Sequence, residues 1–153
     1  MSATLLICSG FLLAVLWMDL MFDVQVLGHG PQNKELPEEV LGSIAAYYRR
    51  VTTLARPMGH VVGGVMLIGI LTLVLQTLLA GHSRWIGGFS LLLFGAPVAM
   101  ALFRVYPNAV RLGSRADPVL EQSRLARAIH KGHLFCLGAM LSFVLLQLLV
   151  GSP

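Results

Sequence analysis

Apolar residues in this chain gather into four long runs, separated by segments in which polar and charged residues return. The runs cover residues 5–27, 57–80, 85–106 and 133–150. A helix of about 20 residues crosses the hydrocarbon core of a bilayer, which is about 30 Å thick. Backbone that faces lipid must satisfy its own hydrogen bonds, so each run is expected to be a helix. The pattern predicts an all-α, polytopic membrane protein: a four-transmembrane-helix bundle forming a single transmembrane domain over residues 1–153.

The composition agrees with this pattern. Hydrophobic residues make up 56% of the 153 residues and charged residues only 12%, whereas soluble domains carry about 25% charged residues. The mean hydropathy is +0.78. These values exclude an ordinary soluble enzyme and a disordered tail. The first run is not expected to be a cleavable signal peptide, because no Lys or Arg precedes it and because it contains Asp19 and Asp23.

Two long connectors, residues 28–56 and 107–132, join the runs in pairs. In the first connector, Pro37 is followed by two glutamates, which is typical of a helix start. Apolar residues then recur at helical spacing, so we predict an amphipathic helix that lies in the membrane interface. In the second connector, Pro107 is expected to stop one helix. Pro118 is expected to begin another, which runs on into the fourth span.

Basic residues lie almost entirely at the connector end of the predicted bundle. Of the 11 Lys and Arg residues, only Arg84 lies at the opposite end, in a short turn over residues 81–84. The positive-inside rule therefore predicts cytoplasmic connectors and extracytoplasmic termini, in the cell (inner or plasma) membrane. The net charge of +4 then reflects topology and contact with anionic lipid, and no nucleic-acid binding is expected. We interpret Tyr47 and Tyr48, which precede two arginines, as interfacial anchors.

Short similarities between the two halves suggest an internal repeat. The second and fourth runs begin with Gly-His pairs that contain His60 and His133, and the first and third end with Phe-x-Val, where x is Asp23 or Arg104. A parallel two-helix repeat would place His60 opposite His133 and Asp23 opposite Arg104. The alternative is chance, because apolar segments align easily with one another.

Ionisable residues of the runs gather at the connector end. Asp19 and Asp23 share one helical face, and Arg104 closes the third run. An ionisable group inside the membrane costs about 2.5–3.5 kcal/mol, so each should face the bundle and have a partner. We expect Asp23 to pair with Arg104, and we predict that Asp19, Asp23 and Arg104 form a ligand or proton site. The alternative is a structural ion-pair network that fixes the packing of the helices.

Histidines supply a candidate metal or haem site. His130, His133 and Cys136 recur every three residues along one helix, and His60 begins the second run. Imidazole with thiolate suits copper, and imidazole with carboxylate suits iron or zinc. Two histidines that face each other across a bundle would also hold a haem. The sequence leaves the cofactor open; the candidates are a haem or a transition metal bound by His60 and His133, with His130 and Cys136 as further ligands.

These residues leave three functions open. Our leading expectation is metal or haem binding, with redox chemistry on a membrane-soluble substrate. One alternative is a component of proton- or ion-coupled transport in which Asp19 titrates. The other is a non-catalytic scaffold or accessory subunit. The expected partners are the lipid bilayer and either a second copy of the chain or a membrane partner protein. Serine-hydrolase and nucleotide-binding motifs are absent, and the sequence does not decide whether the protein is an enzyme.

Overall fold

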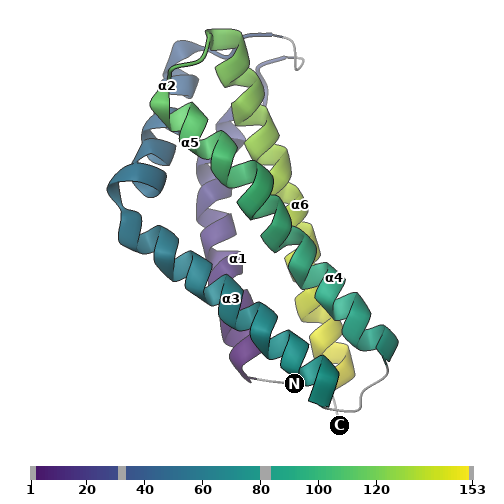
Figure 1. Cartoon of the computed structure of the whole chain (residues 1–153). Coiled ribbons are helices and arrows are strands. Elements are labelled where there is room, and N and C mark those ends of the chain that lie inside the picture. Colours follow the sequence, from purple (N-terminus) through teal and green to yellow (C-terminus); the bar gives the residue numbers. More distant parts are fainter. Residues whose placement is uncertain (1–2, 31–33, 80–83, 152–153) are drawn as a thin grey trace.

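The computed structural model describes residues 3–30, 34–79 and 84–151, and every regular element among them is helical (Figure 1). In chain order the elements are α1 (Ala3–Asp23), η1 (Val24–Val26), α2 (Glu38–Arg49), η2 (Arg50–Leu54), α3 (Arg56–Leu79), α4 (Arg84–Met100), η3 (Ala101–Val105), α5 (Tyr106–Ser114) and α6 (Val119–Gly151). Four stretches are long and apolar enough to cross a membrane: Ala3–Val26, Pro57–Leu79, Trp85–Ser114 and Val119–Val150. The predicted fold class is therefore confirmed. Residues 81–83 of the predicted turn lie outside the described residues.

The third and fourth spans are longer than their apolar runs. α4, η3 and α5 follow one another without a break, and α6 runs for 33 residues beside them (Figure 1). The continuous α6 confirms the helix predicted from Pro118. The predicted stop at Pro107 is wrong, because the helix passes directly from η3 into α5 and continues through this proline to Ser114. The π-helical turn η3 precedes it, and the Tyr106 N–H there donates to the Ala101 carbonyl.

The membrane spans meet in an apolar core between α1, α3, α4 and α6. Phe94 of α4 and Phe143 of α6 lie edge to face at its centre, with ring centroids 5.2 Å apart. α3 crosses α4 at this level, because a Cβ atom at Gly69 would lie only 2.3 Å from the Phe94 ring. Glycine at this position therefore sets how closely the two helices approach.

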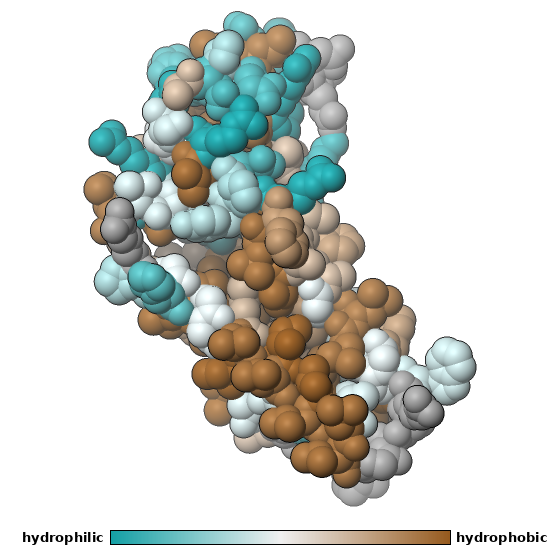
Figure 2. All heavy atoms as spheres, in the orientation of Figure 1, coloured by the Kyte–Doolittle hydropathy of each residue, from teal (hydrophilic) through white to brown (hydrophobic). Residues whose placement is uncertain are grey.

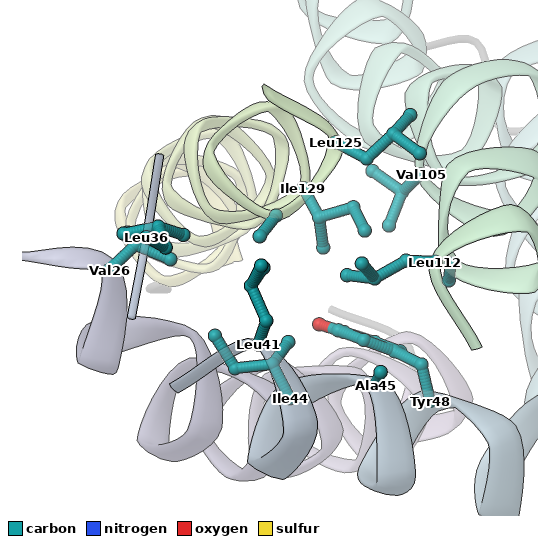
Figure 3. Packing of buried hydrophobic residues seen from close by; sticks show 12 residues of the cluster. Val26, Leu36, Leu41, Ile44, Ala45, Tyr48, Val105, Leu112, Leu125 and Ile129 are labelled. Carbon is teal, nitrogen blue, oxygen red and sulfur yellow. The ribbon is translucent and has the colours of Figure 1, made fainter. Parts of the chain in front are cut away.

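A second apolar core lies at the connector end, in what we call the head: α2, α5 and residues 119–131 of α6. Figure 3 shows Leu41 and Tyr48 of α2 pointing toward Leu112 of α5 and Ile129 of α6. The helix predicted in the first connector is thus confirmed, but its predicted place in the membrane interface is not, because its apolar face packs against α5 and α6 instead of lipid. Hydrophilic residues gather over the head, and hydrophobic residues cover the opposite end of the molecule (Figure 2).

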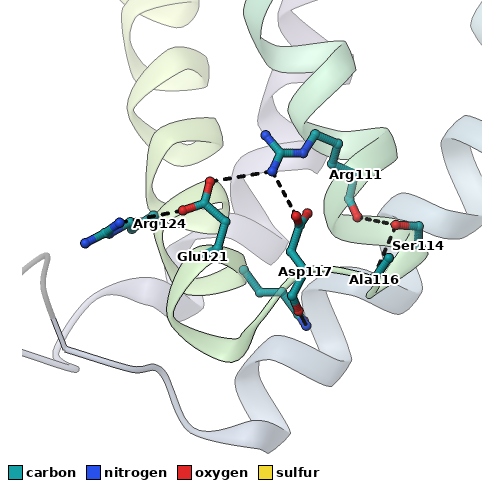
Figure 4. A network of polar contacts seen from close by, with 7 residues as sticks. Arg111, Ser114, Ala116, Asp117, Glu121 and Arg124 are labelled. Atoms are coloured by element: carbon teal, nitrogen blue, oxygen red, sulfur yellow. Dashed lines mark hydrogen bonds and ion pairs between the residues drawn. The ribbon is translucent and has the colours of Figure 1, made fainter.

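Exposed ion pairs join α5 to the beginning of α6 (Figure 4). The Arg111 guanidinium lies 2.9 Å from the Asp117 carboxylate and 3.6 Å from Glu121. Arg115 has left-handed backbone (φ 55°) at the end of α5, and its guanidinium reaches Glu38 of α2 at 2.8 Å. Each such exposed pair stabilises the fold by about 0–1 kcal/mol, so the buried cores decide the packing of the head.

Candidate functional site

A buried polar network lies where the head meets the membrane spans. It consists of five side chains from three helices: Asp19 and Asp23 of α1, Tyr47 and Tyr48 of α2, and His133 of α6. These helices bring together residues that are far apart in the chain, such as Asp23 and His133, which are separated by 110 positions. The network therefore exists only in the folded protein.

Asp23 is the most deeply buried member of the network, with 0% of its surface exposed. Its Oδ1 accepts a hydrogen bond of 2.5 Å from the Tyr48 hydroxyl. Its Oδ2 lies 2.6 Å from Nδ1 of His133. Because a carboxylate oxygen only accepts, Nδ1 carries the proton in this contact. Two donors, one to each oxygen, thus satisfy a carboxylate that has no access to solvent.

Asp19 lies one helical turn deeper into the span and contacts the other side of the imidazole. Its Oδ1 accepts a 2.6 Å hydrogen bond from the Tyr47 hydroxyl, and its Oδ2 lies 3.6 Å from Nε2 of His133. The Asp19 side chain remains 16% exposed. His133 is therefore placed between two carboxylates, closer to Asp23 than to Asp19.

Tyr47 and Tyr48 act as hydrogen-bond donors from α2. The Tyr47 ring stacks on Phe22, with centroids 4.0 Å apart. Burial, followed by the negative charges of Asp19 and Asp23, raises the pKa of both phenols, so both remain protonated. Their interpretation as interfacial anchors misses this role. The sequence did contain a clue to this role. Embedded Asp19 and Asp23 need hydrogen-bond donors, and the predicted amphipathic helix carries the two tyrosine hydroxyls.

The expected pair of Asp23 and Arg104 is wrong. The partners of Asp23 are Tyr48 and His133, whereas Arg104 is exposed and has no side-chain partner among the described residues. The reason lies in the π-helical turn of η3. Its Val105 is buried and faces α6, because a Cβ atom at Gly132 would lie 2.7 Å from the Val105 side chain. Arg104, the preceding residue, is consequently on the outside.

The predicted pairing of His60 with His133 is also wrong. His60 is exposed at the beginning of α3, whereas His133 is buried on α6. α3 packs mainly against α1 and α4, and its exposed His60 does not face the buried His133, so the two imidazoles do not hold a haem between them. The two pairings expected from the internal repeat are therefore both missing, and the repeat itself stays a prediction.

The remaining predicted ligands have other surroundings. His130 is buried, and its Nδ1 has no hydrogen-bond partner among the residues described. The buried Cys136 thiol donates to the Pro97 carbonyl at 3.6 Å. The described parts of the chain contain no group of three or more His, Cys, Asp or Glu residues arranged to hold a metal ion. The residues present therefore do not fit the predicted metal or haem site.

The chain matches the profile of one protein family, the SHR3 chaperone family described as ER membrane protein SH3, over residues 1–149. This match covers the four spans, apart from the last residue of the fourth, and every member of the polar network. The comparisons with curated proteins and with solved structures gave no match.

The family corrects two expectations from the sequence. The leading function, a metal or haem protein with redox chemistry, is wrong, and the alternative of a transport component is not supported either. The other alternative, a non-catalytic accessory protein, agrees better with a chaperone family. The expected cell or plasma membrane is also wrong, because the family is one of the endoplasmic reticulum (ER) membrane, although a multi-pass protein is confirmed. A membrane partner protein is consistent with the family, whereas a homo-oligomer stays a prediction.

Proposed function

Because the chain belongs to the family of ER membrane protein SH3, we propose that it is a membrane chaperone of the ER that assists polytopic membrane proteins, with amino-acid permeases as the client class. The observation that carries this proposal is the family match over residues 1–149. A chaperone of this kind works by contact with helices of another protein and not by chemistry on a small substrate.

The surface of the membrane spans supports such contacts. Large apolar side chains are exposed along several spans, among them Met21 of α1, Leu71 of α3 and Leu145 of α6. In a bilayer these side chains contact either lipid or another helix. Met18 and Met21 of α1 add flexible thioether side chains, which adapt to partners of different shape.

The polar network supports the same function indirectly. Asp19 and Asp23 both interact with His133 inside the molecule. These contacts offset the free-energy cost of placing ionisable groups in a membrane, so no partner from outside the chain is needed. The surface that remains for lipid or for a client is consequently mostly apolar. A client helix would meet van der Waals contacts, which suits transient association.

Site-specific photo-cross-linking in ER membranes tests this function. A photoreactive amino acid at Met21 or Leu71 should give adducts with a newly made amino-acid permease, whereas the same group at the exposed Glu39 of the head serves as a control outside the spans. An unrelated polytopic membrane protein should give no adduct. Adducts with lipid alone from every membrane-facing position would contradict the proposal.

The cellular consequence provides a second test. Cells that lack the protein should retain amino-acid permeases in the ER, while unrelated polytopic proteins reach their destination. Restoring the chain should restore delivery. Normal permease delivery without the protein would contradict the proposed client class.

A further inference from the structure

The two ring nitrogens of His133 both face carboxylate oxygens. Nδ1 lies 2.6 Å from Asp23 Oδ2, and Nε2 lies 3.6 Å from Asp19 Oδ2. A neutral imidazole has one N–H donor and one lone-pair acceptor. Since Nδ1 donates to Asp23, the lone pair of a neutral ring would point toward the oxygen lone pairs of Asp19. With both carboxylates ionised, this arrangement is repulsive.

One additional proton removes the repulsion. It can reside on Nε2, which makes His133 an imidazolium, or on Asp19 Oδ2, which makes that group a carboxylic acid. Either position gives a donor facing an acceptor, and either lowers the net charge of the network from −2 to −1. In a medium of low dielectric constant, two uncompensated negative charges are far more costly than one.

Among the described residues, neither α2 nor η3 brings a buried Lys or Arg side chain to the imidazole. Tyr47 and Tyr48 on α2 are neutral donors, and the η3 cation Arg104 is exposed. On α6 itself, His130 lies one turn before His133, and Cys136 one turn after it is bonded to a backbone carbonyl. A proton between His133 and Asp19 would therefore neutralise the second carboxylate.

We propose that the network is a proton-binding site, which takes up one proton between His133 and Asp19 and thereby fastens α2 to α1 and α6. The inference does not depend on the proposed chaperone function. Tyr47 and Tyr48 hydrogen-bond α2 to α1. The Tyr47 hydroxyl donates to Asp19, and the Tyr48 hydroxyl donates to Asp23. Loss of the proton forces Asp19 away from the imidazole, and the Tyr47 contact moves with it. α2 is then held to α1 by the Tyr48 hydrogen bond alone among the two described tyrosine contacts, so its attachment to the spans weakens.

The substitution Asp19→Asn tests the proposal, because an amide is nearly the same size and carries a permanent N–H donor for Nε2. Thermal unfolding of the purified full chain in detergent should show a Tm that falls as the pH rises above about 6.5, where free imidazole is mostly neutral. The sign follows from proton counting: the folded state holds one proton more than the unfolded state, so stability decreases with pH. The slope at its steepest should be about 3–5 °C per pH unit for one proton.

In Asp19→Asn this slope should disappear, whereas the control His60→Gln, at an exposed histidine, should keep it. The protection of α2 amides against hydrogen exchange, corrected for the intrinsic pH dependence of exchange, should fall with pH in the wild type and not in Asp19→Asn. A flat wild-type profile, or the same slope in Asp19→Asn as in the wild type, would overturn the proposal.

Spectroscopy of the wild type keeps the proposal testable if Asp19→Asn does not fold. Nitrogen NMR of labelled histidines should show His133 as an imidazolium near neutral pH, or infrared spectra should show a protonated carboxylic acid. Either result supports the site and locates its proton. A neutral His133 together with two ionised carboxylates would exclude it.

Discussion

The Tyr48 hydroxyl donates a 2.5 Å hydrogen bond to Asp23, which joins the last turn of α2 to the last residue of α1. Both side chains are buried, and the Tyr48 ring is at the same time part of the apolar core of the head. One residue thus connects the head core to the polar network inside the spans. The packing of the head and the satisfaction of Asp23 therefore depend on each other.

Replacing Tyr48 by Phe should destabilise the protein by about 1.5–3 kcal/mol, because one oxygen of a buried carboxylate loses its donor while the ring is kept. Tyr47→Phe should cost less, since Asp19 is 16% exposed and Asp23 is 0% exposed. Equilibrium unfolding in detergent measures both free energies. Equal losses for the two variants would show that burial of the acceptor does not matter here.

The charges of Asp23 and Arg104 should act independently. Asp23→Ala leaves His133 and Tyr48 without their acceptor and should cost about 3–5 kcal/mol. Arg104→Gln, at an exposed position without a side-chain partner among the described residues, should change stability by less than about 0.5 kcal/mol. The two effects should add in the double variant. A clear coupling energy would mean that the two residues interact after all.

Gly69 should not tolerate a side chain. A Cβ atom there would lie 2.3 Å from the Phe94 ring, so Gly69→Ala forces α3 and α4 apart and should cost about 1–3 kcal/mol. Gly63→Ala, one to two turns earlier on α3 with nothing within 4 Å of the new atom, is the matched control and should be neutral. Adding Phe94→Leu should recover part of the loss in Gly69→Ala. If Phe94→Leu restores no stability, the strain in Gly69→Ala does not arise from contact with the Phe94 ring.

The phenols of Tyr47 and Tyr48 should resist alkaline titration. Burial raises the pKa of both groups in the folded protein, whereas a tyrosine of the unfolded chain titrates near pH 10. The stability that they contribute is therefore complete below about pH 10 and declines as the pH rises further. In a Tyr106→Phe background these two are the only tyrosines. Their phenolate absorbance should appear together with unfolding, and reversible ionisation in the folded protein would contradict their burial.

The membrane helices could be predicted because lipid imposes a simple requirement on local sequence. A run of about 20 apolar residues must be helical wherever its neighbours lie, so the four spans needed no tertiary information. The helix of the first connector could also be predicted, from the helical spacing of its apolar residues and from Pro37 at its start. The prediction at Pro107 failed because the effect of a proline on a helix depends on the turn before it. Here a π-helical turn precedes Pro107, and the helix continues into α5.

The sequence by itself determined that Asp19, Asp23 and His133 belong to one end of the bundle and that an embedded acid needs a partner. Only the tertiary structure decided which partner, because this depends on how each helix is rotated and on which helices touch. Val105 rather than Arg104 faces α6, α3 carries His60 away from α6, and α2 brings two tyrosines to the acids. A rotation of one residue about a helix axis, about 100°, exchanges an inward side chain for an outward one. Periodicity alone therefore locates a polar cluster but cannot assign its contacts.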